Sequence, residues 1–195
     1  MLFRESSIRG VLLIDPEPRA DERGFFARTW CQREFDDHGL SLRVAQCGVS
    51  FNASAGTLRG LHYQAAPHEE EKLVRCTQGA IYDVAVDLRE GSPTQYEWFA
   101  AELTATNHRM LYVPAGCAHG FLTLADNSEV FYQVSQEFCL DSSRGARWDD
   151  PAFGITWPTP VHVISERDRT LPLVGEAAAV AIPRGNRSRN WEATR

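Results

Sequence analysis

Short apolar runs separated by turn residues make up most of this chain, and that pattern is typical of a β-rich protein. Residues 10–14 (GVLLI) predict a first strand, which the prolines of residues 15–18 end. Further strand-sized runs recur at residues 43–51, 72–76, 80–88, 98–104, 110–113, 119–124 and 129–134. In the first half, only residues 30–39 have helical spacing, with Gly39 as the expected stop. Strands that follow one another without helices between them predict an antiparallel sandwich or barrel.

Residues 81–88 (IYDVAVDL) are the most informative of these strands. A period of two places Tyr82 and Val84 on one face, with Asp83, Ala85 and Asp87 on the other. Carboxylates that point into a barrel would form a polar site, whereas carboxylates on the exterior would be ordinary surface charges. The sequence leaves both possibilities open.

Length and composition predict one globular domain with acidic character. The 195 residues suffice for a substantial core, and we place the domain at residues 1–182, followed by a polar, mobile tail at residues 183–195. A net charge of -6 argues against nucleic acid as a partner, although a local basic cleft could still bind a small phosphate compound. Five scattered cysteines without CxxC spacing fit a reducing cytosol. With no signal pattern and no membrane-spanning run, we expect a cytoplasmic protein without a membrane partner.

The first candidate for chemistry is the segment GTLRGLHYQ at residues 56–64, where Arg59 and His62 stand three residues apart. An Arg can hold a phosphate or carboxylate bidentately, and an imidazole is the usual base near neutral pH. The pair indicates an anionic substrate that loses a proton. A structural His beside a solvated Arg accounts for this segment alone equally well.

A second candidate is PAGCAHGF at residues 114–121, where a tight turn leads into a strand that begins with His119. This PxGxxH pattern resembles the second motif of cupins, the small double-stranded β-helix barrels, many of which bind a metal. The first cupin motif supplies an HxH pair and a Glu, yet His62 is followed here by Tyr63 and Gln64. Two His ligands without a third leave a metal under-coordinated, so we expect no metal.

Together with six further segments, these two motifs resemble the dTDP-4-dehydrorhamnose 3,5-epimerase family over roughly residues 11–173. The matching segments are DERGFF (21–26), LRGLHYQ (58–64), KLVR (72–75), DVAVDLR (83–89), SPT (92–94), PAGCAHGF (114–121), WDDP (148–151) and SERD (165–168). The resemblance implies a mainly β, cupin-type double-stranded β-helix (jelly-roll) barrel with a few short helices. It also implies catalysis without a cofactor, and a homodimer.

Four residues receive catalytic roles from this resemblance. A hydrogen next to a ketone is a poor acid, so its removal requires a positioned base and a group that stabilises the enolate oxygen. The resemblance makes His62 the base and Asp168 the carboxylate that orients it. It places Lys72 near the C4 oxygen of the sugar and makes Tyr132 the donor of a proton to the opposite face.

Substrate-binding roles follow in the same way. The resemblance implies that Arg23 and Arg59 bind the diphosphate, while His119 and Asp83 complete a polar wall. On its own, Arg23 is explained equally well as a turn charge, and Tyr132 is explained better as a strand aromatic with its hydroxyl at the surface.

The chain departs from the family at the nucleotide end. Arg28 stands where many members have Glu, and Phe138 replaces a Tyr that stacks on thymine. A Gln-x-Asn pair aligns with residues 47–49 (CGV), although Gln46 lies one residue earlier, and a Glu is replaced by Ser143. Exchange of a carboxylate for a guanidinium removes an acceptor and supplies donors, so a different base such as cytosine becomes conceivable.

We therefore expect an epimerase that inverts C3 and C5 of a nucleotide-diphospho-4-keto-6-deoxyhexose. An epimerase limited to C3, or one for another nucleotide or 4-keto sugar, is the nearest alternative. A sugar-nucleotide-binding cupin without catalysis and a metal-dependent cupin that uses His62 and His119 are more distant ones.

Overall fold

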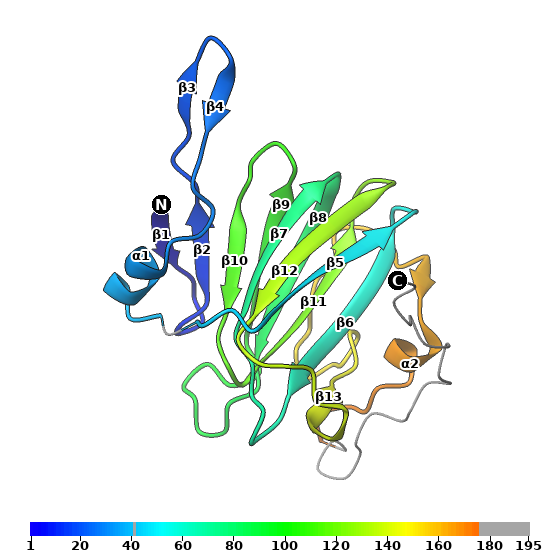
Figure 1. The fold of residues 1–195 in the computed structure, drawn as a ribbon. Helices are drawn as coiled ribbons and strands as arrows, with labels where there is room; N and C mark the ends of the chain where they lie inside the picture. Colours follow the sequence, from blue (N-terminus) through cyan, green and yellow to red (C-terminus); the bar gives the residue numbers. More distant parts are fainter. Residues whose placement is uncertain (41, 176–195) are drawn as a thin grey trace, which may run out of the picture.

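A computed structural model describes residues 1–40 and 42–175, which form two antiparallel sheets that face each other as a barrel (Figure 1). The first sheet has the order β1 (Leu2–Glu5), β2 (Leu12–Asp15), β10 (Met110–Val113), β7 (Lys72–Gln78), β12 (Ser128–Val134) and β5 (Gln46–Asn52). The second has the order β13 (Ser143–Gly145), β6 (Thr57–Gln64), β11 (Cys117–Thr123), β8 (Ala80–Asp87) and β9 (Trp98–Thr104), and β14 (Val163–Ile164) runs parallel to β6. The predicted mainly β barrel is confirmed.

The remaining elements are short. A two-stranded hairpin, β3 (Arg19–Asp21) and β4 (Gly24–Phe26), projects away from the barrel (Figure 1). The helices are α1 (Gln32–Asp37), α2 (Glu166–Arg169) and the 3-10 turn η1 (Leu140–Ser142). Helix α1 lies within the segment for which the sequence predicted a helix. The proposed boundary at residue 182 and the tail at residues 183–195 lie outside the described residues.

The main core lies between the two sheets and settles the orientation of β8. Ile81 and Ala85 are fully buried in the core, together with Val74 of the opposite sheet. Because Asp83 shares a face with Ala85, its carboxylate points to the barrel interior, where it is 0% exposed. The carboxylates of this strand are therefore interior groups and not surface charges.

The outer face of the second sheet is covered by a segment that returns across it. Val84 and Val86 pack there against Ala146 and Phe153, with Trp157 at the edge of the cluster. These contacts make residues 146–157 an ordered cover of the second sheet.

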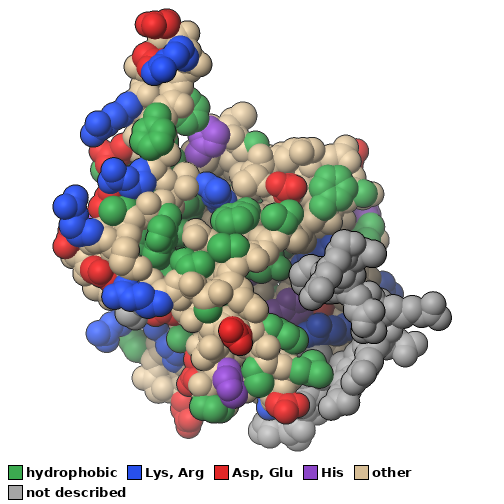
Figure 2. Space-filling view, viewed as in Figure 1, with side chains coloured by type: hydrophobic (Ala, Val, Ile, Leu, Met, Phe, Trp, Pro, Cys, Tyr) green, Lys and Arg blue, Asp and Glu red, His purple; other side chains and the backbone are tan. Residues whose placement is uncertain are grey.

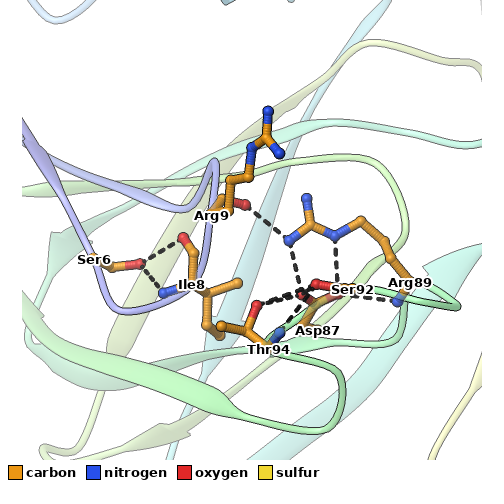
Figure 3. Close-up of polar contacts among 7 residues, drawn as sticks. All are labelled: Ser6, Ile8, Arg9, Asp87, Arg89, Ser92 and Thr94. Carbon is orange, nitrogen blue, oxygen red and sulfur yellow. Dashed lines mark hydrogen bonds and ion pairs between the residues drawn. The ribbon is translucent and has the colours of Figure 1, made fainter.

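Asp87 ties the end of β8 to the neighbouring loops (Figure 3). Its buried carboxylate accepts hydrogen bonds from Arg89, Ser92 and Thr94, and Arg89 also donates to the carbonyl oxygen of Arg9. Burial acts to raise the pKa of Asp87, but the hydrogen bonds from Arg89, Ser92 and Thr94 outweigh it and hold this pKa well below its ordinary value. The cluster anchors the N-terminal loop against the barrel.

The first sheet presents apolar side chains to solvent. Val49 and Phe51 of the edge strand β5 are 56% and 53% exposed, and Val49 lies opposite Phe131 in the sheet. The guanidinium of Arg75 lies 4.9 Å from the ring centroid of Phe131. Figure 2 shows apolar groups gathered on this face, below the projecting hairpin.

None of the helices in residues 1–40 and 42–175 is long and apolar enough to cross a membrane.

Candidate active site

A cavity of 840 Å³ opens between the two sheets. Its walls come from β5, β7 and β12 on one side and from β6 and β11 on the other, with α2 at the edge. The lining includes eight of the eleven residues for which the sequence predicted a site role. They are Gln46, Arg59, His62, Lys72, His119, Tyr132, Phe138 and Asp168.

A bulge in β6 brings Arg59 and His62 to the same wall. Against β11, His62 lies opposite His119 and Arg59 lies opposite Phe121. Strand β6 therefore advances three residues over the distance in which β11 advances two. Residues three apart on a regular strand point to opposite faces, and the extra residue restores a common face. Gly60 in the bulge has a φ of +135°, and a Cβ there would lie 2.6 Å from the Cα of Gly120. Only glycine fits this close approach.

His62 and Asp168 form a hydrogen-bonded pair on this wall. The His62 Nε2 and Asp168 Oδ1 atoms are 2.7 Å apart, and the backbone N–H of Gly60 donates to Asp168 Oδ2 at 3.3 Å. Ser165 caps α2 by accepting from the backbone N–H of Asp168 at 3.0 Å. This bond fixes the backbone from which the carboxylate projects.

The charge of Asp168 determines how the imidazole is held. Burial raises the pKa of Asp168, but the hydrogen bond from His62, its charge and the Gly60 N–H together leave that pKa below its ordinary value. An ionised carboxylate accepts only, so Nε2 of His62 donates to it and Nδ1 is the nitrogen that can take a proton from a ligand.

Lys72 begins β7 and presents its ammonium to the cavity. The Nζ atom donates to the carbonyl oxygen of His62 at 3.1 Å and lies 3.1 Å from Oε1 of Glu70. The residue is 9% exposed, so its charge acts in a poorly solvated environment where electrostatic interactions are strong.

Tyr132 stands on the wall opposite to His62. It lies in β12 between Gly48 of β5 and Val74 of β7, and its ring packs over Gly48. A Cβ at Gly48 would lie 2.7 Å from the Cε2, Cζ and Oη atoms of the phenol, so the phenol occupies the space that glycine leaves.

A second His–Asp pair lies beside the first. His119 Nε2 is 2.8 Å from Oδ1 of Asp83, and the two residues belong to the adjacent strands β11 and β8. His119 lines the cavity, whereas Asp83 lies behind it. Among the described residues no group of three or more His, Cys, Asp or Glu is arranged to hold a metal ion. The expectation of a metal-free site stays a prediction.

The remaining lining residues lie toward the opening. Arg59 donates from Nε to Oδ1 of Asn52 at 2.7 Å and from Nη2 to the carbonyl oxygen of Phe51 at 3.4 Å, which leaves Nη1 and the second N–H of Nη2 for a ligand. Gln46 accepts from the backbone N–H of Phe138 at 3.1 Å, and the Phe138 side chain is 61% exposed. An exposed ring at the edge of a cavity is available for stacking.

Two predicted ligands lie away from this cavity. Arg23 is at the tip of the β3–β4 hairpin, where its side chain is 83% exposed and pairs with Asp21. Arg28 pairs with Glu34 of α1 at 2.8 Å. Within one chain, neither guanidinium is brought to the site.

Sequence reasoning missed two charged residues of the cavity, Glu70 and Arg167. Glu70 stands two residues before Lys72, and alternation along an extended segment places such residues on one face, so this signal was available. Arg167 donates to Oγ of Ser143 at 3.3 Å. Its place depends on how α2 packs against β6, which no local pattern reveals.

Comparison of the sequence with known families gives one match. The profile of the dTDP-4-dehydrorhamnose 3,5-epimerase family matches residues 5–176. A dTDP-4-dehydrorhamnose 3,5-epimerase of Sinorhizobium fredii is 44% identical over 177 residues, which cover 90% of this chain and 91% of the relative.

Solved structures of the same kind resemble the fold closely. The Legionella pneumophila dTDP-6-deoxy-D-glucose-3,5-epimerase in complex with dTDP-4-keto-L-rhamnose has a TM-score of 0.86 and 32% identity, over 95% of this chain and 99% of that one. A 3'-monoepimerase from Streptomyces bikiniensis in complex with dTDP-quinovose has a TM-score of 0.82 and 32% identity, over 88% and 87% of the two chains. The predicted cupin-type jelly roll is confirmed by this likeness.

Proposed function

The chain belongs to the dTDP-4-dehydrorhamnose 3,5-epimerase family, and we propose that its cavity inverts C3 and C5 of dTDP-4-keto-6-deoxyglucose through enolate intermediates. As a member, the chain is an epimerase of deoxysugar biosynthesis. The observation that carries the assignment of roles is the placement of a His–Asp pair and a tyrosine on opposite walls of one cavity.

Proton removal falls to His62. Both C3 and C5 are next to the C4 ketone, so loss of either hydrogen places negative charge on the C4 oxygen. His62 accepts the proton at Nδ1, and Asp168 stabilises the imidazolium that forms. Lys72 is the cation that faces the developing charge, and its fixed position avoids reorganisation during the step.

Inversion requires the new proton to arrive from the other side of the ring. Tyr132 projects from the first sheet, whereas His62 projects from the second, so a sugar between them exposes one face to each. A phenol can give its proton to the carbanion and recover one from solvent. Return of the proton from His62 would restore the starting configuration, and delivery from Tyr132 inverts it.

Substrate binding uses the outer part of the cavity. Arg59 suits a diphosphate because a guanidinium binds phosphate oxygens bidentately. Phe138 provides a ring for the nucleotide base beside Gln46. We assign thymidine as the base, and cytidine stays the alternative because Phe138 lacks a hydroxyl and Arg28 and Ser143 replace carboxylates.

We further propose a homodimer in which the β3–β4 hairpin of each copy contributes Arg23 to the site of its partner. The hairpin that carries Arg23 projects beyond its own barrel (Figure 1), and Phe25 and Phe26 in it are 53% and 69% exposed. These apolar side chains, together with Val49 and Phe51, fit burial against a second copy. This arrangement would account for the distance of Arg23 and Arg28 from the cavity of their own chain.

Complementation tests this arrangement. Arg23→Ala and His62→Ala homodimers should each be defective, and mixed dimers should regain activity because one site then has His62 and an intact hairpin from the partner. Mixtures with no more activity than their components would refute the exchange of hairpins.

All five cysteines lie within the described residues and are unpaired. Free thiols fit a reducing compartment, and we propose that the enzyme acts in the cytoplasm.

Solvent exchange tests the reaction itself. The enzyme is incubated with dTDP-4-keto-6-deoxyglucose in deuterated water, with His62→Ala alongside, and C3 and C5 are read by NMR. Deuterium at both carbons with inversion supports the 3,5-epimerase, and deuterium at C3 alone selects the narrower reaction of the Streptomyces bikiniensis relative. No exchange despite dTDP binding favours a non-catalytic binding protein, and turnover that depends on stoichiometric metal favours a metal-dependent cupin.

A further inference from the structure

Glu70 lies beside Lys72 in the wall of the cavity. Its Oε1 is 3.1 Å from the Lys72 Nζ atom, and the two side chains are 12% and 11% exposed. Glu70 precedes β7 by two residues, so both side chains leave the same face of the chain. Shielding from solvent makes this ion pair more strongly oriented than a pair on the surface.

The contacts of the ammonium account for two of its three donors. A Lys ammonium carries three N–H groups and no acceptor. One is directed to Glu70, and a second donates to the carbonyl oxygen of His62 at 3.1 Å. The third N–H is left for a ligand in the cavity. With only one of these two anchors, the flexible four-carbon stem would let the ammonium turn.

Glu70 is itself fixed from the other side. Its Oε2 lies 3.4 Å from Nε2 of Gln64, a residue that is 3% exposed. The same Gln64 Nε2 lies 3.1 Å from the carbonyl oxygen of His68 and 3.2 Å from that of Glu137, so its two N–H groups are shared among three acceptors, and Oε1 accepts from the backbone N–H of Cys139 at 2.6 Å. The carboxylate therefore belongs to a buried network that ends at the segment that carries Phe138.

We infer that Glu70 is a positioning residue, which aims the third N–H of Lys72 at the C4 oxygen of the substrate. The inference rests on the proposed function, because it requires Lys72 to stabilise an enolate. Glu70 acts through Lys72 and does not itself contact the sugar. Gln64 holds Glu70 in place and links it to the nucleotide end of the cavity.

A double-mutant cycle separates this role from a merely structural one. The variants are Glu70→Ala, Lys72→Met and the double variant, with Glu70→Gln as the conservative change. Glu69→Ala is the matched control, because Glu69 is adjacent, of the same type and exposed. The readouts are kcat for inversion, deuterium exchange at C3, the Kd for dTDP and Tm.

Glu70→Ala should lower kcat and C3 exchange by about 10- to 100-fold, because a misplaced donor loses part of its stabilisation of the transition state. The Kd for dTDP should change by less than about threefold, because the diphosphate and base are held elsewhere. Glu70→Gln keeps an acceptor of the same shape and should recover part of the loss. In the Lys72→Met background, Glu70→Ala should cause no further loss.

Three results would overturn the inference. The first is a Glu70→Ala kcat equal to that of Glu69→Ala. The second is an undiminished further loss of kcat when Glu70→Ala is added to Lys72→Met. The third is a parallel fall of kcat, dTDP affinity and Tm in Glu70→Ala. Failure of the proposed function has a different signature, since the wild type and Glu69→Ala would then bind dTDP without exchanging C3 or C5. That result would remove the inference along with the function.

Discussion

Gly48→Ala tests whether the position of Tyr132 controls inversion. The added Cβ would lie 2.7 Å from two ring carbons and the phenolic oxygen of Tyr132, whereas carbon atoms in contact are separated by about 3.5–4.0 Å. The phenol must therefore retreat by roughly 1 Å. Gly48 does not have a positive φ, so the backbone of β5 accepts alanine and the effect falls on the ring.

A displacement of about 1 Å in a catalytic group can cost about 100-fold in rate, and we expect inversion to slow by that amount. Proton removal by His62 should suffer much less, because the opposite wall is unchanged. In deuterated water, NMR should then show deuterium entering C3 with retained configuration faster than product forms. Tyr132→Phe should give the same separation of exchange from inversion.

Gly175→Ala is the control, because a Cβ there meets nothing within 4 Å and the residue does not have a positive φ. Thermal unfolding of all variants distinguishes a shifted ring from a damaged barrel. Inversion at the wild-type rate by a folded Gly48→Ala enzyme would refute the reasoning, and so would equal losses of exchange and inversion.

Three further outcomes follow from the contacts. Asp168→Asn should slow C3 exchange, followed by NMR, by about 10³-fold or more, while isothermal calorimetry should show that dTDP still binds. An equal loss of dTDP binding would mean that the His62–Asp168 pair is structural. Arg59→Ala should weaken dTDP binding by about 2 kcal/mol, or roughly 30-fold, with a smaller effect on kcat, and unchanged affinity would remove Arg59 from the diphosphate site. Asp87→Asn should lower the free energy of unfolding by about 2–4 kcal/mol at pH 7, measured by urea titration. Because the folded-state pKa of Asp87 is lowered, its contribution to stability is fully present above the unfolded pKa of about 4 and is lost as pH falls through the folded value. The free energies of unfolding of the wild type and Asp87→Asn should therefore converge only in acid.

The sequence predicted much of the barrel because its strands have strong local signals. Alternation and turn residues locate β7 to β12, and Gly39 lies two residues beyond the end of α1. Strand β6 went unrecognised as a strand, because the odd spacing of Arg59 and His62 breaks the alternation that identifies strands. The short β13 and β14 pair with β6 over only three and two residues, and such brief pairing leaves no periodic pattern.

The site was predictable where motifs fix residue identity, and not where distant segments meet. Eight of the eleven predicted residues line the cavity, and Asp83 supports one of them. Which face of β8 is interior depends on the segment that covers the other face, so the sequence alone left Asp83 undecided. Arg23 illustrates the opposite limit, since the structure places it at an exposed hairpin tip away from the cavity of its own chain, and the role that we propose for it in a second copy would leave no local feature in the sequence.

The bulge in β6 makes the combination of Arg59 and His62 a matter of chain length as much as of side-chain identity. Removal of one residue between them, at Gly60 or Leu61, would restore the regular pleat and turn one of the two side chains away from the cavity. A single deletion could thus remove either the anion-binding Arg or the base from the cavity, although every functional side chain would still be present in the sequence. In an alignment of related chains, the number of residues between this Arg and His is therefore as informative as the presence of the two residues themselves.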